Sequence, residues 1–364
     1  EGYRKLPLSA IVLDEASAIR NPDTLAAKAA RKMQAAVKIA ISGTPVENSV
    51  RDLWSIFQFL MPGYLGGRED FRKRYELPCS AESPDQATRA AMQRLRWRTE
   101  PFMLRRTKSL VAKDLPPKIE SVVWCDPSPM QRDYYQSILR HGAEKVDAVR
   151  KLSGADGARM QMLTVLLRLR QSCCDLRLLD KGLDEKPLAD ISVKLARLMD
   201  LLGEAKRGDH RVLVFSQFTS MLTLIRNELD AENVSYSYLD GATRDRAAVV
   251  DAFQKSDGPP VFLISLKAGG YGLTLTAADT VVLFDPWWNP AVEAQAADRI
   301  HRIGQSRPAT IYKLITRGTV EEKILKLQEK KKSMISAAIG EAENEARPLM
   351  TGLSESEMRD LLDD

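Results

Sequence analysis

Short apolar runs recur along the second half of the chain, and segments with helical amphipathic spacing separate them. The runs expected to be buried strands are 211–216, 235–239, 260–265, 281–284 and 310–315. The helices expected between them are 192–206, 220–231 and 244–254, and a further helix should start at Asn289-Pro290. Strands that alternate with helices in this way are typical of a parallel sheet covered on both faces. We therefore predict an α/β fold built on doubly wound parallel sheets.

The first half of the chain shows the same pattern less completely. Strands are expected at 8–13, 38–41 and 119–125, and helices at 52–60, 130–179 and 320–339. The long block 130–179 should break near Ser153-Gly154, because glycine interrupts a helical pattern. Residues 64–108 are polar and rich in arginine, which fits either a solvated helix face or a surface that contacts phosphates. The pattern therefore predicts a second, partial sheet and helical insertions.

Composition narrows the possible functions only slightly. The 364 residues suffice for two or three domains, and the net charge of +5 permits nucleic-acid binding without requiring it. The four cysteines form no CxxC pair and the three histidines are scattered, so a zinc or histidine metal site is not expected. No apolar run reaches transmembrane length, so we expect no membrane association.

Two polar segments follow the first two predicted strands. Asp14 and Glu15 come directly after the first strand, where open α/β sheets place their ligands. An aspartate there can hold magnesium and a neighbouring glutamate can polarise water, although the pair could equally cap the next helix. Ser42 and Thr44 flank Gly43 after the second strand. Their hydroxyls could bind a phosphate, or the segment could be a simple turn.

Two further segments of the second half have a functional interpretation. Gln295, Asp298, Arg299 and Arg302 have the spacing i, i+3, i+4 and i+7, which predicts one helical face. A solvated, salt-bridged surface is the alternative. The segment 265–272 has three glycines in its last four residues, which would let backbone N–H groups approach a phosphate, and Lys267 adds a positive charge. Steric need alone also explains such a turn.

Taken together and in this order, the segments resemble superfamily-2 helicase-like ATPases of the Swi/Snf type, especially the bacterial members. DEAS resembles their Walker B box, SGTP the third motif, VLVFSQF the fourth, the stretch from SLKAGGYG to LFD the fifth, and QAADRIHRIGQ the sixth. The same class also has segments similar in sequence to FMLRRTK, DLPPKIE and LLRLRQSCC. The resemblance covers nearly the whole chain.

This resemblance implies two RecA-like lobes, with ATP between them and duplex DNA lying across both. The first lobe would be partial, formed by 1–60 and 100–128, and the second complete at 186–318. Helical protrusions would occupy 61–99 and 129–185, and 319–364 would form a helical brace or tail.

The resemblance also implies a role for each motif residue. Asp14 would bind magnesium through water and Glu15 would orient the attacking water, while Arg299 and Arg302 would act as arginine fingers. The other ATP-binding positions would be Gly272, Gln295 and Asp298, and the DNA-binding positions would be Ser42, Thr44, Gln217, Lys267 and Trp288. For Trp288 a packed core indole is the alternative.

Three departures from the family pattern qualify this picture. Ser17 stands where the class usually has His or Gln, and Thr274 stands where Asn is common. No G-x-x-x-x-G-K-[ST] occurs in the 364 residues, so we expect the P-loop, with the N-terminal half of the motor, to lie upstream of Glu1. We therefore expect the C-terminal portion of an ATP-dependent double-stranded-DNA translocase, inactive by itself.

Such a motor would use ATP and Mg²⁺ and would work in the bacterial cytoplasm near the nucleoid, with DNA-bound protein complexes as further candidate partners. The alternative is an ATPase-inactive fragment or homologue that binds DNA or a partner. RNA as the substrate is a weaker option.

Overall fold

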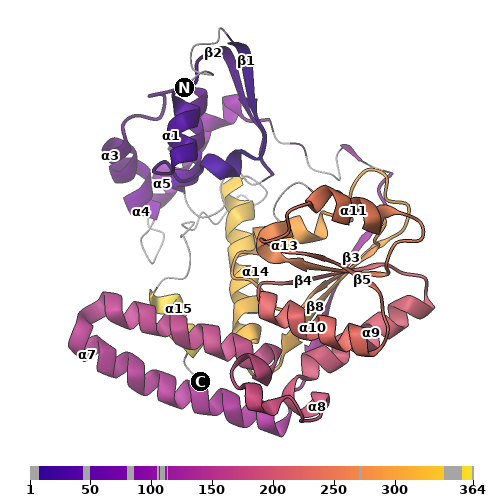
Figure 1. Ribbon diagram of the computed structural model, residues 1–364. Helices are drawn as coiled ribbons and strands as arrows, with labels where there is room; N and C mark the ends of the chain where they lie inside the picture. Colours follow the sequence, from indigo (N-terminus) through magenta and orange to yellow (C-terminus); the bar gives the residue numbers. More distant parts are fainter. Residues whose placement is uncertain are drawn as a thin grey trace. The chain divides into compact units, whose positions relative to one another are not determined.

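The computed structural model describes residues 8–43, 50–79, 86–104, 106, 111–112, 114–269, 273–339 and 355–362 (Figure 1). The chain divides into two compact units, which we describe one at a time. Unit 1 comprises Glu1–Arg105 and Glu329–Ser354, and unit 2 comprises Arg106–Gln328 and Glu355–Asp364.

Unit 2 is built on a six-stranded parallel sheet in the part that the structure describes. The strand order is β3-β8-β7-β4-β6-β5. The strands are β3 (Lys118–Cys125), β4 (Val212–Ser216), β5 (Tyr236–Leu239), β6 (Val261–Ser265), β7 (Thr280–Leu283) and β8 (Ala309–Thr316). All neighbouring pairs run parallel, which confirms the predicted fold class.

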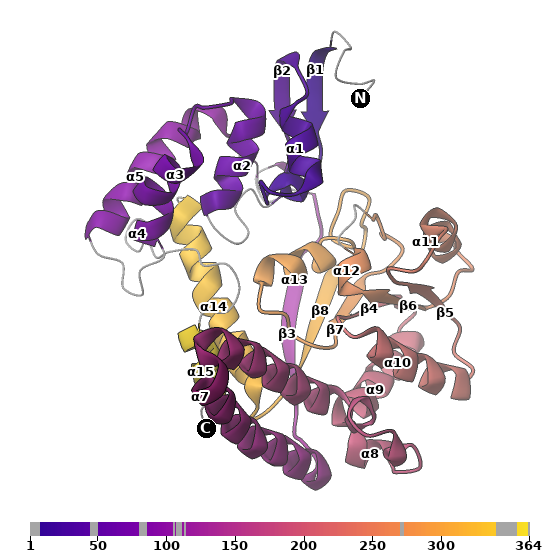
Figure 2. The ribbon, with the colours of Figure 1, turned by 60° about the vertical axis from the view of Figure 1, so that its left-hand side comes forward.

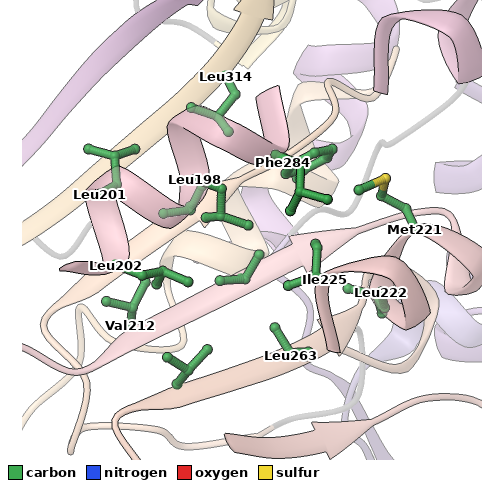
Figure 3. Packing of buried hydrophobic residues seen from close by; sticks show 14 of the residues in the cluster. Leu198, Leu201, Leu202, Val212, Met221, Leu222, Ile225, Leu263, Phe284 and Leu314 are labelled. Carbon is green, nitrogen blue, oxygen red and sulfur yellow. The ribbon is translucent and has the colours of Figure 1, made fainter. Parts of the chain in front are cut away.

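Helices cover both faces of this sheet (Figures 1 and 2). On one face α9 (Val193–Arg207) and α10 (Thr219–Ala231) pack against Val212 and Val214 of β4 (Figure 3). On the other face α11 (Arg246–Gln254), α12 (Leu266–Gly269) and α13 (Pro290–Ala297) pack against Leu213 and Phe215. The central strands are therefore apolar at every position because each side chain enters one of two cores.

The first strand of this sheet corrects one predicted boundary. We expected 100–128 to close the first lobe, but all eight residues of β3 pair with β8, from Lys118 opposite Ala309 to Cys125 opposite Thr316. The backbone N–H of Ala309 also donates to the carbonyl of Pro117, which extends this ladder. An apolar run predicts a strand but not its partner, so the pattern could not assign β3 to unit 2.

The long helical insertion is α7 (Pro129–Cys174). Gly154 interrupts it with φ 70° and ψ −160°, which divides α7 into two arms, as the Ser153-Gly154 break predicted. The arms approach closely, because a Cβ added at Gly142 would lie 2.5 Å from the Val165 side chain. The helix α15 (Glu355–Leu362) packs on α7 and buries Met358 and Leu361 (Figures 1 and 2).

Unit 1 contains a parallel strand pair and a group of helices. The strands are β1 (Leu8–Leu13) and β2 (Ala35–Ala40). The helices are α1 (Leu25–Arg31), α2 (Val50–Leu60), α3 (Arg68–Phe71), α4 (Leu77–Cys79) and α5 (Gln86–Thr99). A core around Trp54, Phe71 and Leu95 holds α2, α3 and α5 together.

The remaining described elements are short, apart from one helix. The helix α14 (Val320–Ile339) has the bounds that the sequence predicted. The short segments are η2 (Ala16–Ile19), η3 (Arg72–Glu76), η4 (Glu100–Phe102), η5 (Leu176–Leu178), η6 (Lys181–Leu183) and α8 (Leu188–Ile191). Within the described ranges, the structure contains no helix with both the length and the apolar character that a membrane span needs.

Candidate functional site

The acidic pair and Ser42 lie together in unit 1. The carbonyl of Leu13 accepts from the N–H of Ile41 at 2.8 Å, and the N–H of Ala16 donates to the carbonyl of Ile41 at 2.9 Å. These bonds join the ends of β1 and β2 and bring the backbone of Asp14 and Glu15 close to that of Ser42. Thr44 lies outside the described residues.

The Asp14 carboxylate suits magnesium held through water. Its Oδ1 accepts the N–H of Glu15 at 2.8 Å, and Glu15 has the left-handed backbone angle φ 47°, so the turn fixes the carboxylate at the end of β1. Asp14 is exposed and offers hard oxygen ligands, which magnesium prefers, usually with one or two carboxylates and several waters. Among the described residues no group of three or more His, Cys, Asp or Glu side chains could hold a metal by itself. The donor set therefore fits a hydrated magnesium ion and not a closed protein site.

The segment that carries the two arginines differs from the predicted helical face. Helix α13 ends at Ala297, so only Gln295 of the four residues lies in it, and 298–304 form turns. The N–H of Asp298 still donates to the carbonyl four residues back, at Ala294, as in an α-helix. The N–H of Arg299 donates to the carbonyl only three residues back, at Ala296, as in a 3₁₀ turn. Turns with i→i+3 bonds at a helix end are common, and their geometry depends on tertiary contacts that the residue spacing does not encode.

Both arginines are bonded to the residues that follow the glycine-rich segment. Arg299, only 2% exposed, donates through Nη1 to the carbonyl of Leu273 at 3.4 Å, and its own carbonyl accepts from Leu275 N at 3.1 Å. Arg302 donates through Nη1 to the hydroxyl of Thr274 at 3.1 Å. We call these contacts of 273–275 with Arg299 and Arg302 the arginine bridge. Gln295 and Asp298 lie half-buried beside it in the chain, and Gly272 lies outside the described residues.

Two side chains of the same segment fix the arginine turn on unit 2. Gln305 donates through Nε2 to the carbonyls of Ala278 at 2.8 Å and Ile300 at 3.2 Å. His301 contacts the carbonyl of Pro116 through Nε2 at 2.9 Å, and since a carbonyl only accepts, Nε2 carries the proton in this contact. The turn is therefore held from both sides, at the sheet and at the segment that leads into β3.

The glycine-rich segment also begins differently from the predicted turn. Residues Leu266–Gly269 form the short helix α12, and the hydroxyl of Ser265 accepts from Ala268 N at 3.3 Å. Burial of Leu266 and Ala268 explains why this part winds into a helical turn. The backbone of Lys267 lies in α12, but its side chain is outside the described part.

Gln217 lies at the end of β4, where the sequence placed it. Its backbone N–H points at both oxygens of Asp285 at 3.3 Å, and Ser216 donates its hydroxyl to Oδ1 of Asp285 at 2.5 Å. Asp285 therefore ties the ends of β4 and β7 together. Burial raises the pKa of Asp285, and the guanidinium of Arg170 acts in the opposite direction.

Trp288 is half-buried, and the guanidinium carbon of Arg170 lies over its indole, 4.2 Å from the ring centroid of Trp288. Arg170, on the second arm of α7, was not among the predicted site residues. A signal existed in the sequence, because Arg170 falls on the same helical stripe as Leu166, Leu169 and Cys173, and all four are buried. A charged residue on an apolar stripe predicts a buried, partnered charge.

A second buried polar group was also missed. Lys194 of α9 contacts Glu321 of α14 at 2.5 Å and donates to the carbonyl of Phe284 at 3.0 Å, with both charges fully buried. Glu293 of α13 accepts from the N–H of Trp287 at 2.8 Å and from Gln328 of α14 at 2.6 Å. These contacts hold the start of α14 against the loop that carries Trp288.

Comparison with known proteins agrees with this geometry. Residues 3–178 match the family model described as the SNF2-related domain, and residues 193–304 match the helicase conserved C-terminal domain. The putative ATP-dependent helicase/translocase YwqA of Bacillus subtilis is 38% identical over 356 residues, which cover 96% of this chain and 37% of that protein. An uncharacterized ATP-dependent helicase of Mycoplasma pneumoniae is 35% identical over 336 residues, covering 92% of this chain and 31% of that protein. The chain thus spans about a third of the length of these curated relatives.

A solved structure supports the same relationship. The SWI2/SNF2 ATPase core of Sulfolobus solfataricus in complex with double-stranded DNA is 34% identical and matches with a TM-score of 0.54, over 99% of this chain and 74% of that one. Both parallel sheets, in units 1 and 2, are consistent with RecA-like lobes. On these grounds the chain belongs to the Snf2-related family of superfamily-2 helicase-like ATPases.

Proposed function

We propose that this chain is the C-terminal portion of an ATP-dependent motor that moves along double-stranded DNA. The observation that carries the proposal is the arginine bridge, because Arg302 and Arg299 are both fastened to 273–275. A guanidinium held in place before the reaction stabilises developing phosphoryl charge without a cost of reorganisation. The DNA-bound state of the Sulfolobus relative supports duplex DNA as the substrate.

Each predicted site residue then has a chemical task. Glu15 orients the water that attacks the γ-phosphoryl group, and Arg299 and Arg302 stabilise the charge that develops there. Magnesium, bound through water at Asp14, would neutralise phosphate charge. Gln217 and Trp288 contact the DNA backbone, together with Ser42, Thr44 and Lys267, and Gly272, Gln295 and Asp298 line the nucleotide. A motor with these contacts would work on the bacterial chromosome and on proteins bound to it.

One part of the machinery has no counterpart in these residues. None of the 364 residues forms a G-x-x-x-x-G-K-[ST] loop, whose backbone and lysine hold the β- and γ-phosphates in this type of motor. We therefore propose that these residues do not hydrolyse ATP by themselves and that the phosphate-binding loop comes from the rest of the motor.

The test is ATP hydrolysis by the complete protein, with and without duplex DNA. Arg302→Ala should lower the DNA-stimulated rate by about three to five orders of magnitude, the usual effect of losing an arginine finger. Arg307→Ala is the matched control, since Arg307 lies on the same segment but bonds to Asp209 and Asp279, outside the arginine bridge. It should keep the parental rate. Arg302→Ala turnover within threefold of the parent would refute the proposal.

The absence of a phosphate-binding loop also favours a second candidate, a module that binds DNA or a partner without hydrolysis. The same experiment separates the two. A complete protein that binds duplex DNA but releases no phosphate above background would support the module.

A further inference from the structure

Arg170 is a buried charge that the proposed function does not use. It lies on the second arm of α7 and is 1% exposed, the largest of the fully buried side chains in the described residues. Removing a guanidinium from water is costly, so its position needs an explanation in its contacts.

Its contacts all lie on the loop between β7 and α13 and at the end of β4. The Nη2 atom donates to the carbonyl of Pro286 at 2.6 Å and lies 3.8 Å from Oδ2 of Asp285. The guanidinium carbon lies 4.2 Å from the ring centroid of Trp288, 5.5 Å from that of Trp287 and 5.7 Å from that of Phe218. Arg170 therefore has an aromatic cage around it, with Trp288 the nearest wall.

These contacts connect α7 to two proposed DNA contacts. Trp288 touches the guanidinium directly. Gln217 is reached through Asp285, whose carboxylate faces the Gln217 N–H at 3.3 Å. Arg170 therefore contacts Trp288 directly and reaches the backbone of Gln217 through Asp285.

Stability alone does not account for this arrangement. The Nε atom of Arg170 is buried and has no hydrogen-bond partner in the described part of the chain, and the Asp285 carboxylate is 3.8 Å away. Lys194 provides a contrast, because its ammonium reaches both a carboxylate at 2.5 Å and a carbonyl at 3.0 Å. Replacing a whole buried ion pair by apolar residues is often neutral for stability, although removing one partner alone is destabilising, so a loosely paired cation at this position points to an effect beyond stability. Its specific effect is then on the geometry of the groups it touches.

We propose that Arg170 is a positioning residue that couples α7 to DNA engagement by holding Trp288 and Gln217 in place. The inference rests on the proposed function, since it takes those two residues as DNA contacts. It adds a role for the second helical insertion, whose arm would set the orientation of the DNA-contacting loop.

The experiment measures duplex DNA affinity of the complete protein by fluorescence anisotropy, together with the DNA dependence of ATP hydrolysis. Arg170→Met should weaken duplex binding about tenfold to thirtyfold, as expected for loss of a desolvated cation–π contact. The DNA concentration that half-saturates hydrolysis should rise in parallel, whereas kcat at saturating DNA should stay within about threefold, a modest change in barrier height. If Arg170→Met does not fold, Arg170→Lys takes its place, because it keeps a cation beside Asp285 but not the planar group that stacks on the indole. It should also bind duplex DNA more weakly than the parent.

Two comparisons separate positioning from a merely structural role. Arg177→Met also removes a largely buried cation, which pairs with Asp175 at 2.8 Å and Glu228 at 3.4 Å, so it should lower the melting temperature yet leave duplex affinity unchanged. In the double variant Arg170→Met/Trp288→Ala, affinity should stay within about twofold of the weaker single variant, because the two residues act through one contact. Effects that multiply, an equal affinity loss in Arg177→Met, or parental affinity in the Arg170 variant would overturn the inference.

The parent protein's DNA binding and ATP hydrolysis show whether the inference about Arg170 fails, or the proposed function, or both. A parent protein that binds duplex DNA without hydrolysis would refute the motor, while the affinity comparison would still decide the role of Arg170. A parent that binds no duplex DNA would refute both.

Discussion

The two sheets of this protein both contain apolar strands but bury their side chains to very different extents. In unit 2 the side chains of Leu213, Phe215 and Phe262 are 0% exposed. In unit 1 Val12 is 56% exposed and Val37 is 52% exposed. Parallel strands normally occur with both faces covered, and two strands form a marginal sheet. The comparison shows that the burial of an apolar strand depends on the layers that cover it.

The difference also divides the candidate site. The arginine bridge is attached to a sheet with a core on each face, whereas Asp14 and Glu15 follow a strand whose outer side chains are half-exposed. We infer that the geometry of the arginines is fixed by unit 2 itself. The acidic pair instead depends on a sheet with one covered face among the described residues, where Ile11 and Leu13 of β1 pack against a small core that includes Phe59.

Truncation of one apolar strand side chain in each sheet should show this difference as the largest effect. Phe262→Ala should destabilise unit 2 by about 3–5 kcal/mol, since Phe262 is fully buried against Phe253 at 5.0 Å between ring centroids. Val12→Ala, its counterpart in unit 1, should change the stability of that unit by only about 0.5 kcal/mol. Hydrogen exchange across a urea series, read separately from peptides of β6 and β1, gives both values. Similar losses in the two units would remove the basis of the comparison.

Ion pairs should show the same contrast with a somewhat smaller effect. Lys194 and Glu321 are paired at 2.5 Å with no exposure, and Glu321→Gln should cost unit 2 about 3–4 kcal/mol, because it leaves a buried charge without its partner. In unit 1 the pair of Arg51 and Asp23 is also 2.5 Å long, but Asp23 is 75% exposed, so Asp23→Asn should cost about 0–1 kcal/mol. Urea denaturation at neutral pH measures both. Equal costs would show that burial does not govern these pairs.

The pH dependence of the buried pair has a definite sign. Burial alone would lower the pKa of Lys194, but the Glu321 carboxylate raises it, and the net pKa lies above the ordinary value of 10.5. The stabilisation by the pair should therefore be complete at neutral pH and should be lost as the pH rises past 10.5. Lys194→Met should lack this alkaline loss. A variant that follows the same alkaline curve as the parent would contradict the assignment.

The sequence predicted local structure better than it predicted partners. The strands and long helices of unit 2 followed from hydrophobic period, but the strand expected at 38–41 is Ala35–Ala40, and α1 (Leu25–Arg31) was not predicted. The choice of Asp14, Gln217 and Arg302 as site residues rested on motif resemblance. The pairing of β3 with β8 could not be predicted, because period fixes which side chains share a face but not which strand lies alongside. The end of α13 at Ala297 depends on contacts of His301 and Gln305 with distant carbonyls. The role of Arg170 depends on the aromatic residues that the fold places around it.

The most direct test of the account is whether Glu15 and Arg302 serve the same step of ATP hydrolysis in the complete protein. Single-turnover phosphate release would be measured for the complete protein, for Glu15→Gln, for Arg302→Ala and for the double variant, each with saturating duplex DNA. We predict that each single change lowers the rate by about a thousandfold or more and that the double variant is no more than about threefold slower than the slower single variant, because residues that serve one transition state are strongly non-additive. Single-variant effects that multiply in the double variant, or either single variant at the parental rate, would contradict the account.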